Sequence, residues 1–482
     1  MSEAGSSHRR ILAATALIGS ASVVNVGFGI VRMKVAALIL GAAGVGLIGL
    51  MQSLVSFAGS VGGLGTQQSA MRQVAAGRAD GGRDGEAAVR AALLRVTIAC
   101  ALAAGLLVWL LRATIAQQLF GDPSLARTVG WMAPGVALTI VAGSQTALLA
   151  GLGRVADVAR TTVLGAILAT IAGVALLFVW REQAIIPYLL VAPGATVLAS
   201  WYFTFRIERH RALPGRWRQQ AALLVRLGVA TLASALILQG AQLAVRGILN
   251  AKLGLADVGL FQAAYVLSST YIAFVLQAMS SDYYPRLSAA IGKPDEAVRL
   301  VNEQTEVTLL LAGPFVLALL GLAPLVLNLL YSSEFAAAAA ALRWQILADV
   351  LRLASWPLGF ALLAAARGRL FVSLEVIAAL VLIGVCAWLV PSLGIVAPGI
   401  AMTIMYAVYL PLVFVAVRRT LPLRWSRAVV RIFALLCGTS LLAFTAAASS
   451  EWAGAIIGTL LAAIWAAVAY RRLSGQLRKL PA

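Results

Sequence analysis

The sequence contains fourteen stretches that are apolar over about the length a helix needs to cross the hydrocarbon core of a bilayer, roughly 20 residues. They are not barrel strands, because membrane barrel strands alternate polar and apolar residues. The stretches are Ile11–Val31, Gly44–Gly63, Ala91–Leu111, Trp131–Ala150, Thr161–Trp180, Ile185–Phe205, Leu227–Val245, Gly259–Ser280, Val307–Leu330, Leu342–Ala365, Leu370–Val390, Ile395–Val417, Ile432–Ala448 and Trp452–Tyr470. The sequence therefore predicts an all-α, polytopic membrane protein with fourteen transmembrane helices.

The composition and the placement of charge agree with a membrane protein. Charged residues make up 12% of the chain, against about 25% in an average soluble protein, and hydrophobic residues make up 61%. The net charge of +20 comes from Lys and Arg residues that gather in short loops on one side of the predicted membrane, such as 206–226. By the positive-inside rule, both termini lie in the cytoplasm of a bacterium, the chain lies in the inner membrane, and no nucleic-acid partner is expected.

Residues suited to metal, redox or covalent chemistry are few. The two histidines, His8 and His210, lie in Arg-rich loops, and the three cysteines lie inside apolar stretches. The acidic residues are scattered, whereas a polyprenyl-phosphate glycosyltransferase would need a carboxylate cluster. The sequence has no G-x-x-x-x-G-K-[ST] phosphate-binding loop. We therefore expect no metal site, no cofactor and no enzymatic activity.

The chain contains an internal repeat. A shift of 214 residues places Arg32 on Arg246 and Arg72 on Arg286. The shift covers an even number of predicted helices, so the two copies have parallel topology, as in transporters built from two like-oriented bundles. We predict an N-terminal lobe of helices 1–6 at residues 1–220, a C-terminal lobe of helices 7–12 at 221–417, and a further helix pair at 418–482.

Polar residues share one face of several predicted helices, although a charge inside a membrane span costs at least about 2.5–3.5 kcal/mol. Asn25 and Arg32 do so in the first helix, and Gln239, Gln242 and Arg246 do so in the first helix of the second repeat. We expect these faces to line a hydrated cavity between the lobes. Arginine offers a fork of donors that fits phosphate oxygens, so the expected cargo is anionic with hydroxyl-rich parts. The candidate cavity residues are Asn25, Arg32, Gln239, Gln242, Arg246, Gln262, Gln345, Asp349 and Arg352.

The charged residues also have simpler structural explanations. Arg32 and Arg246 lie near the predicted outer ends of their helices, where a long side chain can extend to the lipid headgroups. Asp349 and Arg352 are three residues apart and can neutralise each other inside a bundle. Asp349 and Glu375 are candidates for proton or sodium coupling, but Glu375 also suits a structural role near the cytoplasmic end of its helix. The residues alone leave these alternatives open.

Three segments carry a resemblance to a known family. They are Val31-Arg32-Met33-Lys34 followed by Gly41 and Gly44, the repeat copy Val245-Arg246 with Gly254 and Gly259-Leu260, and Asp282-Tyr283-Tyr284-Pro285-Arg286-Leu287-Ser288. Together they resemble the Wzx-type polysaccharide flippases of the multidrug/oligosaccharidyl-lipid/polysaccharide exporter superfamily. The resemblance covers about the first 417 residues, and the third segment is most similar to the O-antigen and enterobacterial-common-antigen branch.

This resemblance implies a V-shaped pair of six-helix lobes that works by alternating access. The implied cargo is an undecaprenyl-pyrophosphate-linked oligosaccharide, which moves from the inner to the outer leaflet for the synthesis of O-antigen or a similar surface polysaccharide. The resemblance also implies that Arg32 helps to hold the pyrophosphate, and that a polysaccharide polymerase and a chain-length regulator are partners. The related lipid II flippases share this arginine and have fourteen helices, so lipid II is an alternative cargo.

A multidrug antiporter of the same superfamily is the second alternative. Such a protein exports cations and would be expected to place acidic residues in its cavity. The first predicted helix has no Asp or Glu, and both polar stripes end in arginine. The charge pattern therefore favours an anionic cargo over a cationic one.

Overall fold

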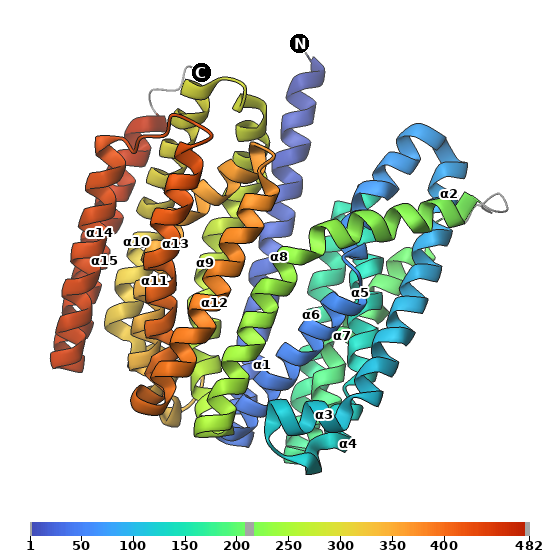
Figure 1. Cartoon of the computed structure of the whole chain (residues 1–482), viewed down its shortest axis with the longest axis horizontal. Helices are drawn as coiled ribbons and strands as arrows, with labels where there is room; N and C mark the ends of the chain where they lie inside the picture. The colour runs from blue at the N-terminus through green and yellow to red at the C-terminus, as the bar shows by residue number, and fades with distance from the viewer. Residues whose placement is uncertain (1, 208–215, 478–482) are drawn as a thin grey trace. The chain divides into compact units, whose positions relative to one another are not determined.

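The computed structural model describes residues 2–207 and 216–477, and within them every regular element is a helix (Figure 1). The helices are α1 (Ser2–Gly62), α2 (Thr66–Leu110), α3 (Arg112–Ile115), α4 (Ala126–Gly130), α5 (Ala133–Gly151), α6 (Val155–Trp180), α7 (Ile185–Phe205), α8 (Arg216–Leu253), α9 (Leu255–Ala290), α10 (Pro294–Leu330), α11 (Ala339–Ala364), α12 (Gly368–Leu393), α13 (Ala397–Arg418), α14 (Arg427–Ser449) and α15 (Glu451–Leu477). The all-α prediction is confirmed. The middle of the predicted loop between the lobes, 208–215, lies outside the described residues.

Glycines interrupt the two longest helices where the sequence predicts turns. Gly41 in α1 has φ 65° and ψ −169°, a backbone conformation that glycine adopts far more readily than other residues. This break lies between the first two apolar stretches, Ile11–Val31 and Gly44–Gly63, so the chain can reverse there. Gly82, with φ 55°, interrupts α2 in the Arg-rich segment that the sequence places in the cytoplasm.

Ten segments among the described residues are long and apolar enough to cross a membrane. Three of them, Leu17–Gly62, Val155–Phe205 and Gly368–Arg418, contain 46 or 51 residues. A helix of that length extends about 70 Å or more, over twice the thickness of the hydrocarbon core, so each segment has the length of two crossings. The polytopic character of the chain is thus confirmed, and the count of fourteen helices stays a prediction.

The chain divides into two compact units, Met1–Ala251 and Lys252–Ala482, which we call the N-terminal and C-terminal units. Helix α8 belongs to the N-terminal unit because its first half packs on α2. Leu224 of α8 is fully buried in a cluster with Ala70, and the Ser69 hydroxyl donates a hydrogen bond to the Leu224 carbonyl at 2.9 Å. The sequence predicts a boundary between the lobes just after residue 220, and that boundary stays a prediction.

The C-terminal helix pair, α14 and α15, packs within the C-terminal unit. A Cβ atom at Gly321 of α10 would lie 2.4 Å from the Gly454 carbonyl oxygen and 2.9 Å from Gly458 Cα, both in α15. Such small residues four apart let two membrane helices approach closely. Arg472 of α15 also forms an ion pair with Glu306 of α10 at 3.2 Å. These contacts tie the predicted 418–482 pair to α10 of the same unit.

Replacing Gly321 by Leu is expected to destabilise the C-terminal unit by about 1–3 kcal/mol, because the new side chain must push α15 away from α10. Thermal unfolding of the purified protein in detergent, followed by tryptophan fluorescence, would show this as a lower midpoint. Gly384→Leu in α12 is the matched control, since a Cβ there meets no atom within 4 Å. Equal midpoints for the two variants would contradict the close approach.

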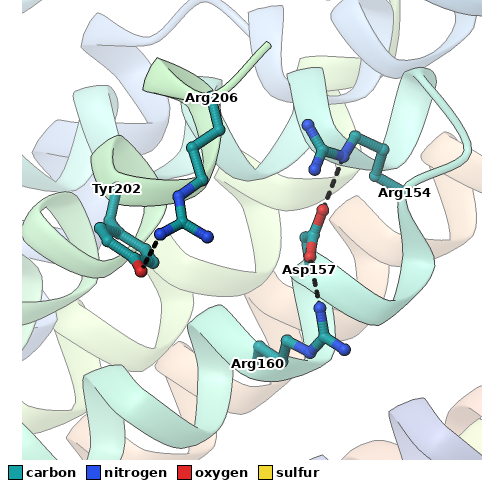
Figure 2. A network of polar contacts seen from close by, with 5 residues as sticks. All are labelled: Arg154, Asp157, Arg160, Tyr202 and Arg206. Atoms are coloured by element: carbon teal, nitrogen blue, oxygen red, sulfur yellow. Dashed lines mark hydrogen bonds and ion pairs between the residues drawn. The ribbon is translucent and has the colours of Figure 1, made fainter.

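Charged residues surround the ends of α6 and α7 that the sequence places in the cytoplasm (Figure 2). Asp157 bridges two arginines, with its carboxylate 2.6 Å from Arg154 and 3.1 Å from Arg160. Arg206 donates a hydrogen bond to the Tyr202 hydroxyl, and its guanidinium carbon lies 4.2 Å from the centre of the Tyr202 ring. The arginines of this network lie at the helix ends where the positive-inside rule expects basic residues. The cytoplasmic placement of the termini stays a prediction.

Candidate functional site

The N-terminal unit contains a pocket at the turn, 63–65, where α1 ends and α2 begins. Its volume is about 520 Å³, within the range of small-molecule sites. Its walls come from α1, α2, α5 and α8, and among the described residues that line it none is charged. The polar lining residues are Ser56, Ser60, Thr66, Gln67, Gln68, Thr139 and Gln239. The pocket is therefore polar but electrically neutral.

Gln239, a predicted cavity residue, lies in the wall of this pocket and pairs with Ser60 across two helices. The Ser60 hydroxyl oxygen is 3.1 Å from Gln239 Oε1 and 2.9 Å from Gln239 Nε2. The hydroxyl donates to the amide oxygen or accepts from the amide nitrogen. This pair connects α1 to α8 and holds both side chains at the pocket wall.

Arg246, which ends the polar stripe of α8, is buried with only 3% of its surface exposed. Its Nη1 donates to the backbone oxygen of Gln242 at 3.0 Å and to the Gln242 side-chain oxygen at 3.1 Å. One turn later, Asn250 Nδ2 donates to the carbonyl oxygens of Leu119 and Phe120, at 3.2 and 2.9 Å. An Arg246 side chain that extended to the lipid headgroups would have a larger exposed fraction.

The side chain of Arg32 lies against α6 and α7. A Cβ at Gly173 of α6 would lie 3.3 Å from the Tyr188 ring of α7 and 3.9 Å from Arg32 Cδ, so the glycine leaves room for both side chains. Arg32 is half-buried, and its Nε is shielded from solvent without a hydrogen-bond partner. A buried donor that makes no hydrogen bond destabilises the folded protein. This guanidinium is therefore suited to donate a hydrogen bond to an acceptor such as a phosphate oxygen.

Three other predicted cavity residues differ in exposure. Asn25 is exposed on α1 of the N-terminal unit. Gln262 of α9 and Gln345 of α11 are buried in the C-terminal unit, with 7% and 0% of their surfaces exposed. The Gln345 amide nitrogen and oxygen have no hydrogen-bond partner. The predicted cavity residues thus belong to both units, and their role in one cavity stays a prediction.

Asp349 and Arg352 belong to a buried polar cluster of the C-terminal unit. Asp349 of α11 is fully buried and accepts hydrogen bonds on Oδ2 from Ser268 at 2.6 Å and Tyr271 at 3.0 Å, both in α9. Its Oδ1 lies 3.7 Å from Arg352 Nη1, within ion-pair distance. The two residues thus compensate each other's charge, which is the structural alternative that their spacing had left open.

Glu375 of α12 is half-buried, and its Oε1 accepts a hydrogen bond from the Tyr409 hydroxyl of α13 at 3.0 Å. No ion pair of Glu375 occurs among the described residues. Within that same part of the chain, no three His, Cys, Asp or Glu side chains come together as a metal-binding group. Glu375 is thus a membrane carboxylate that accepts a hydrogen bond from a neutral phenol and that the charge of Arg352 reaches without an ion pair.

Several residues of these sites escaped the sequence analysis. Tyr188 and Gly173 contact Arg32, and Ser268 and Tyr271 bind Asp349, yet all four lie in apolar stretches without a polar stripe that singles them out. The spacing of Ser268 and Tyr271, three residues apart on one helix face, was the available signal for the second pair. Nothing in the local sequence pointed to the first pair.

Comparison with known proteins gives related sequences over most of the chain. The family described as "Polysaccharide biosynthesis protein" matches residues 35–340. Lipid III flippases of Escherichia coli (strain K12) and Shigella flexneri are each 27% identical over 403 residues, covering 82% of this chain and 94% of each relative. These matches confirm the family resemblance that the three sequence segments indicated.

Solved structures of membrane transporters share the fold. The lipid II flippase MurJ in an inward closed conformation has a TM-score of 0.69 at 15% identity, covering 95% of this chain and 99% of that one. An inward-facing MATE multidrug resistance transporter of the MOP superfamily has a TM-score of 0.64 at 16% identity, covering 83% and 95%. The family match extends over more than half of the sequence. The chain therefore belongs to the polysaccharide biosynthesis protein family and has the fold of the MOP superfamily.

Proposed function

We propose that the protein is a flippase that moves an undecaprenyl-pyrophosphate-linked oligosaccharide from the inner to the outer leaflet of the bacterial inner membrane by alternating access. The family match and the two lipid III flippases support a lipid-linked precursor as the cargo. The product would serve the synthesis of O-antigen or a similar surface polysaccharide, with a polymerase and a chain-length regulator as later partners. Lipid II is the alternative cargo, supported by the fold shared with MurJ.

The observation that carries this proposal is the environment of Arg32. A guanidinium inside the membrane whose Nε is shielded and makes no hydrogen bond raises the free energy of the folded protein. An anionic ligand that binds the guanidinium would lower this free energy. In the proposed mechanism Arg32 and Arg246 hold the pyrophosphate while the polyprenyl chain stays in the lipid. No bond is made or broken, so the protein needs only to bind the headgroup and to change conformation.

Ligand-induced stabilisation can test whether the cargo is an anion or a cation, because a ligand that binds only the folded state raises the midpoint of thermal unfolding. We expect the purified chain to be stabilised by undecaprenyl pyrophosphate linked to a trisaccharide of N-acetylglucosamine. The lipophilic cation tetraphenylphosphonium should leave the midpoint unchanged. Stabilisation by the cation alone would instead favour a multidrug antiporter and reject the flippase.

Glu375 and Asp349 are the two candidate sites of energy coupling. Asp349 forms an ion pair with Arg352, whereas Glu375 feels the charge of Arg352 without an ion pair and accepts a hydrogen bond from neutral Tyr409, so we place the coupling proton or sodium ion at Glu375. Its carboxylate can bind a cation when the cation concentration is high and release it when the concentration is low.

The variant Glu375→Gln is expected to remove the response of transport to an imposed proton or sodium gradient, because an amide cannot change its charge. Translocation without a gradient should persist, since Gln keeps an acceptor for Tyr409. Initial rates in proteoliposomes with and without each gradient would measure the effect. A gradient response equal to that of the unmodified protein would exclude Glu375 from coupling.

A further inference from the structure

We propose that the neutral pocket of the N-terminal unit binds the uncharged sugars of the lipid-linked substrate. This proposal rests on the flippase function, and it assigns two parts of one substrate to two separate binding sites. Arg32 and Arg246 would take the charged pyrophosphate, and the pocket would take the glycan. The sequence analysis expected one cavity for both the anionic and the hydroxyl-rich parts of the cargo and included Gln239 in its lining, but it did not predict a separate neutral pocket.

The chemistry of the pocket wall matches sugar hydroxyls rather than phosphate. Serine, threonine and glutamine side chains each both donate and accept hydrogen bonds, as sugar hydroxyl and acetamido groups do. Among the described residues the lining has no Lys or Arg, so a phosphate there would lose its hydration without gaining a counter-charge. A neutral polyhydroxylated group has no such charge to compensate.

Part of the wall is already fixed, and part is open to a ligand. The hydrogen bond between Ser60 and Gln239 joins two helices and holds both groups in place before any ligand arrives. Ser56, Gln67 and Gln68 are exposed while lining the same pocket. Fixed groups lower the entropy lost on binding, and the open groups supply further hydrogen bonds.

Glycines shape this pocket. Gly59 and Gly63 lie in its wall without side chains to fill it, and Gly65 adopts the left-handed conformation, φ 62°, that begins α2. A Cβ at Gly65 would lie 2.2 Å from the Gly228 carbonyl oxygen, so the turn is held directly against α8. The turn at Gly65 therefore packs directly on α8 beside the pocket.

The pocket and Arg32 lie at different depths in the proposed topology. Arg32 precedes the Gly41 break by nine residues, and Ser60 follows that break by nineteen. With the two halves of α1 antiparallel, as the predicted topology requires, the ten-residue difference corresponds to about 15 Å along the membrane normal. A glycan of several sugars can extend over this distance from its pyrophosphate, whereas the pyrophosphate alone cannot.

Binding of two lipids to the purified full-length chain in lipid nanodiscs tests this division. The lipids are undecaprenyl pyrophosphate and the same lipid linked to a trisaccharide of N-acetylglucosamine. The double variant Ser60→Ala/Gln239→Leu removes both partners of the interhelical hydrogen bond together, so neither is left unpaired. Ser56→Leu fills the pocket from an exposed position. Ser53→Ala is the matched control, because Ser53 bonds to the Gly49 carbonyl one turn away and does not line the pocket.

We expect both pocket variants to bind the trisaccharide lipid about tenfold more weakly, with unchanged affinity for the sugar-free lipid, while Ser53→Ala changes neither affinity. If the unmodified chain binds both lipids equally, or if the variants weaken both to the same extent, the pocket does not recognise sugar although the flippase proposal stands. An equal loss for Ser53→Ala would also reject the pocket. If the unmodified chain binds neither lipid, the proposed function fails and the sugar site fails with it.

Discussion

Substitution of Arg32 by Ala should lower the translocation of an undecaprenyl-pyrophosphate-linked glycan by about 10- to 150-fold. This range corresponds to the loss of hydrogen bonding to a charged group, about 1.5–3 kcal/mol. The Arg32 side chain lies beside Gly173 and Tyr188, and within the described part of the chain its shielded Nε has no hydrogen-bond partner and it forms no ion pair, so its loss removes a cation without breaking such a contact. Stability in detergent should therefore stay close to that of the unmodified protein. Initial translocation rates at equal protein density measure the effect.

Two further variants separate charge from geometry at this position. Arg32→Lys keeps the charge but loses the planar fork, so it should recover only part of the activity. Arg127→Ala removes an exposed arginine that the sequence also places on the outer side, and it should leave the rate unchanged. If Arg127→Ala and Arg32→Ala reduced transport equally, the effect would reflect general surface charge and not binding at Arg32.

The largest effect on stability is expected at Asp349. Replacing it by Ala leaves Arg352 without its counter-charge and leaves the hydroxyls of Ser268 and Tyr271 without their acceptor. Breaking a buried ion pair in this way costs about 3–5 kcal/mol. The unfolding midpoint of the purified variant in detergent should fall clearly below that of Gly321→Leu.

A double-mutant cycle tests whether the pair acts as a unit. The double variant Asp349→Leu/Arg352→Met replaces both charges by apolar groups, and such replacements often cost little. We expect it to be more stable than either Asp349→Leu or Arg352→Met alone. Destabilisation equal to the sum of the two single variants would show that the residues act independently and would contradict the ion pair.

The helical framework could be predicted because its cause is local. A stretch such as Ile185–Phe205 is apolar over the length of a membrane crossing, and the structure has α7 with the same bounds. Gly41, with its positive φ, accounts for the break between the first two stretches. Backbone hydrogen bonds must be satisfied within the segment when lipid replaces water, so apolar length alone nearly determines a helix.

The candidate sites could be predicted only in part, because they depend on contacts between helices. The periodic spacing of Gln239, Gln242 and Arg246 shows that they share a face of α8, but not that Ser60 of α1 covers Gln239. Arg32 lies beside a tyrosine and a glycine from two other helices, and no sequence pattern connects the three residues. The pocket likewise depends on a close approach of two backbones, at Gly65 and Gly228, more than 160 positions apart in the chain.

Translocation by the purified chain in proteoliposomes tests the central claim most directly. Undecaprenyl pyrophosphate linked to a trisaccharide of N-acetylglucosamine is placed in one leaflet, and a membrane-impermeant lectin reports its arrival in the other. We predict that vesicles with the unmodified chain expose the glycan far faster than protein-free vesicles, and that Arg32→Ala vesicles lose most of this gain. Equal rates with and without the unmodified chain would contradict the account.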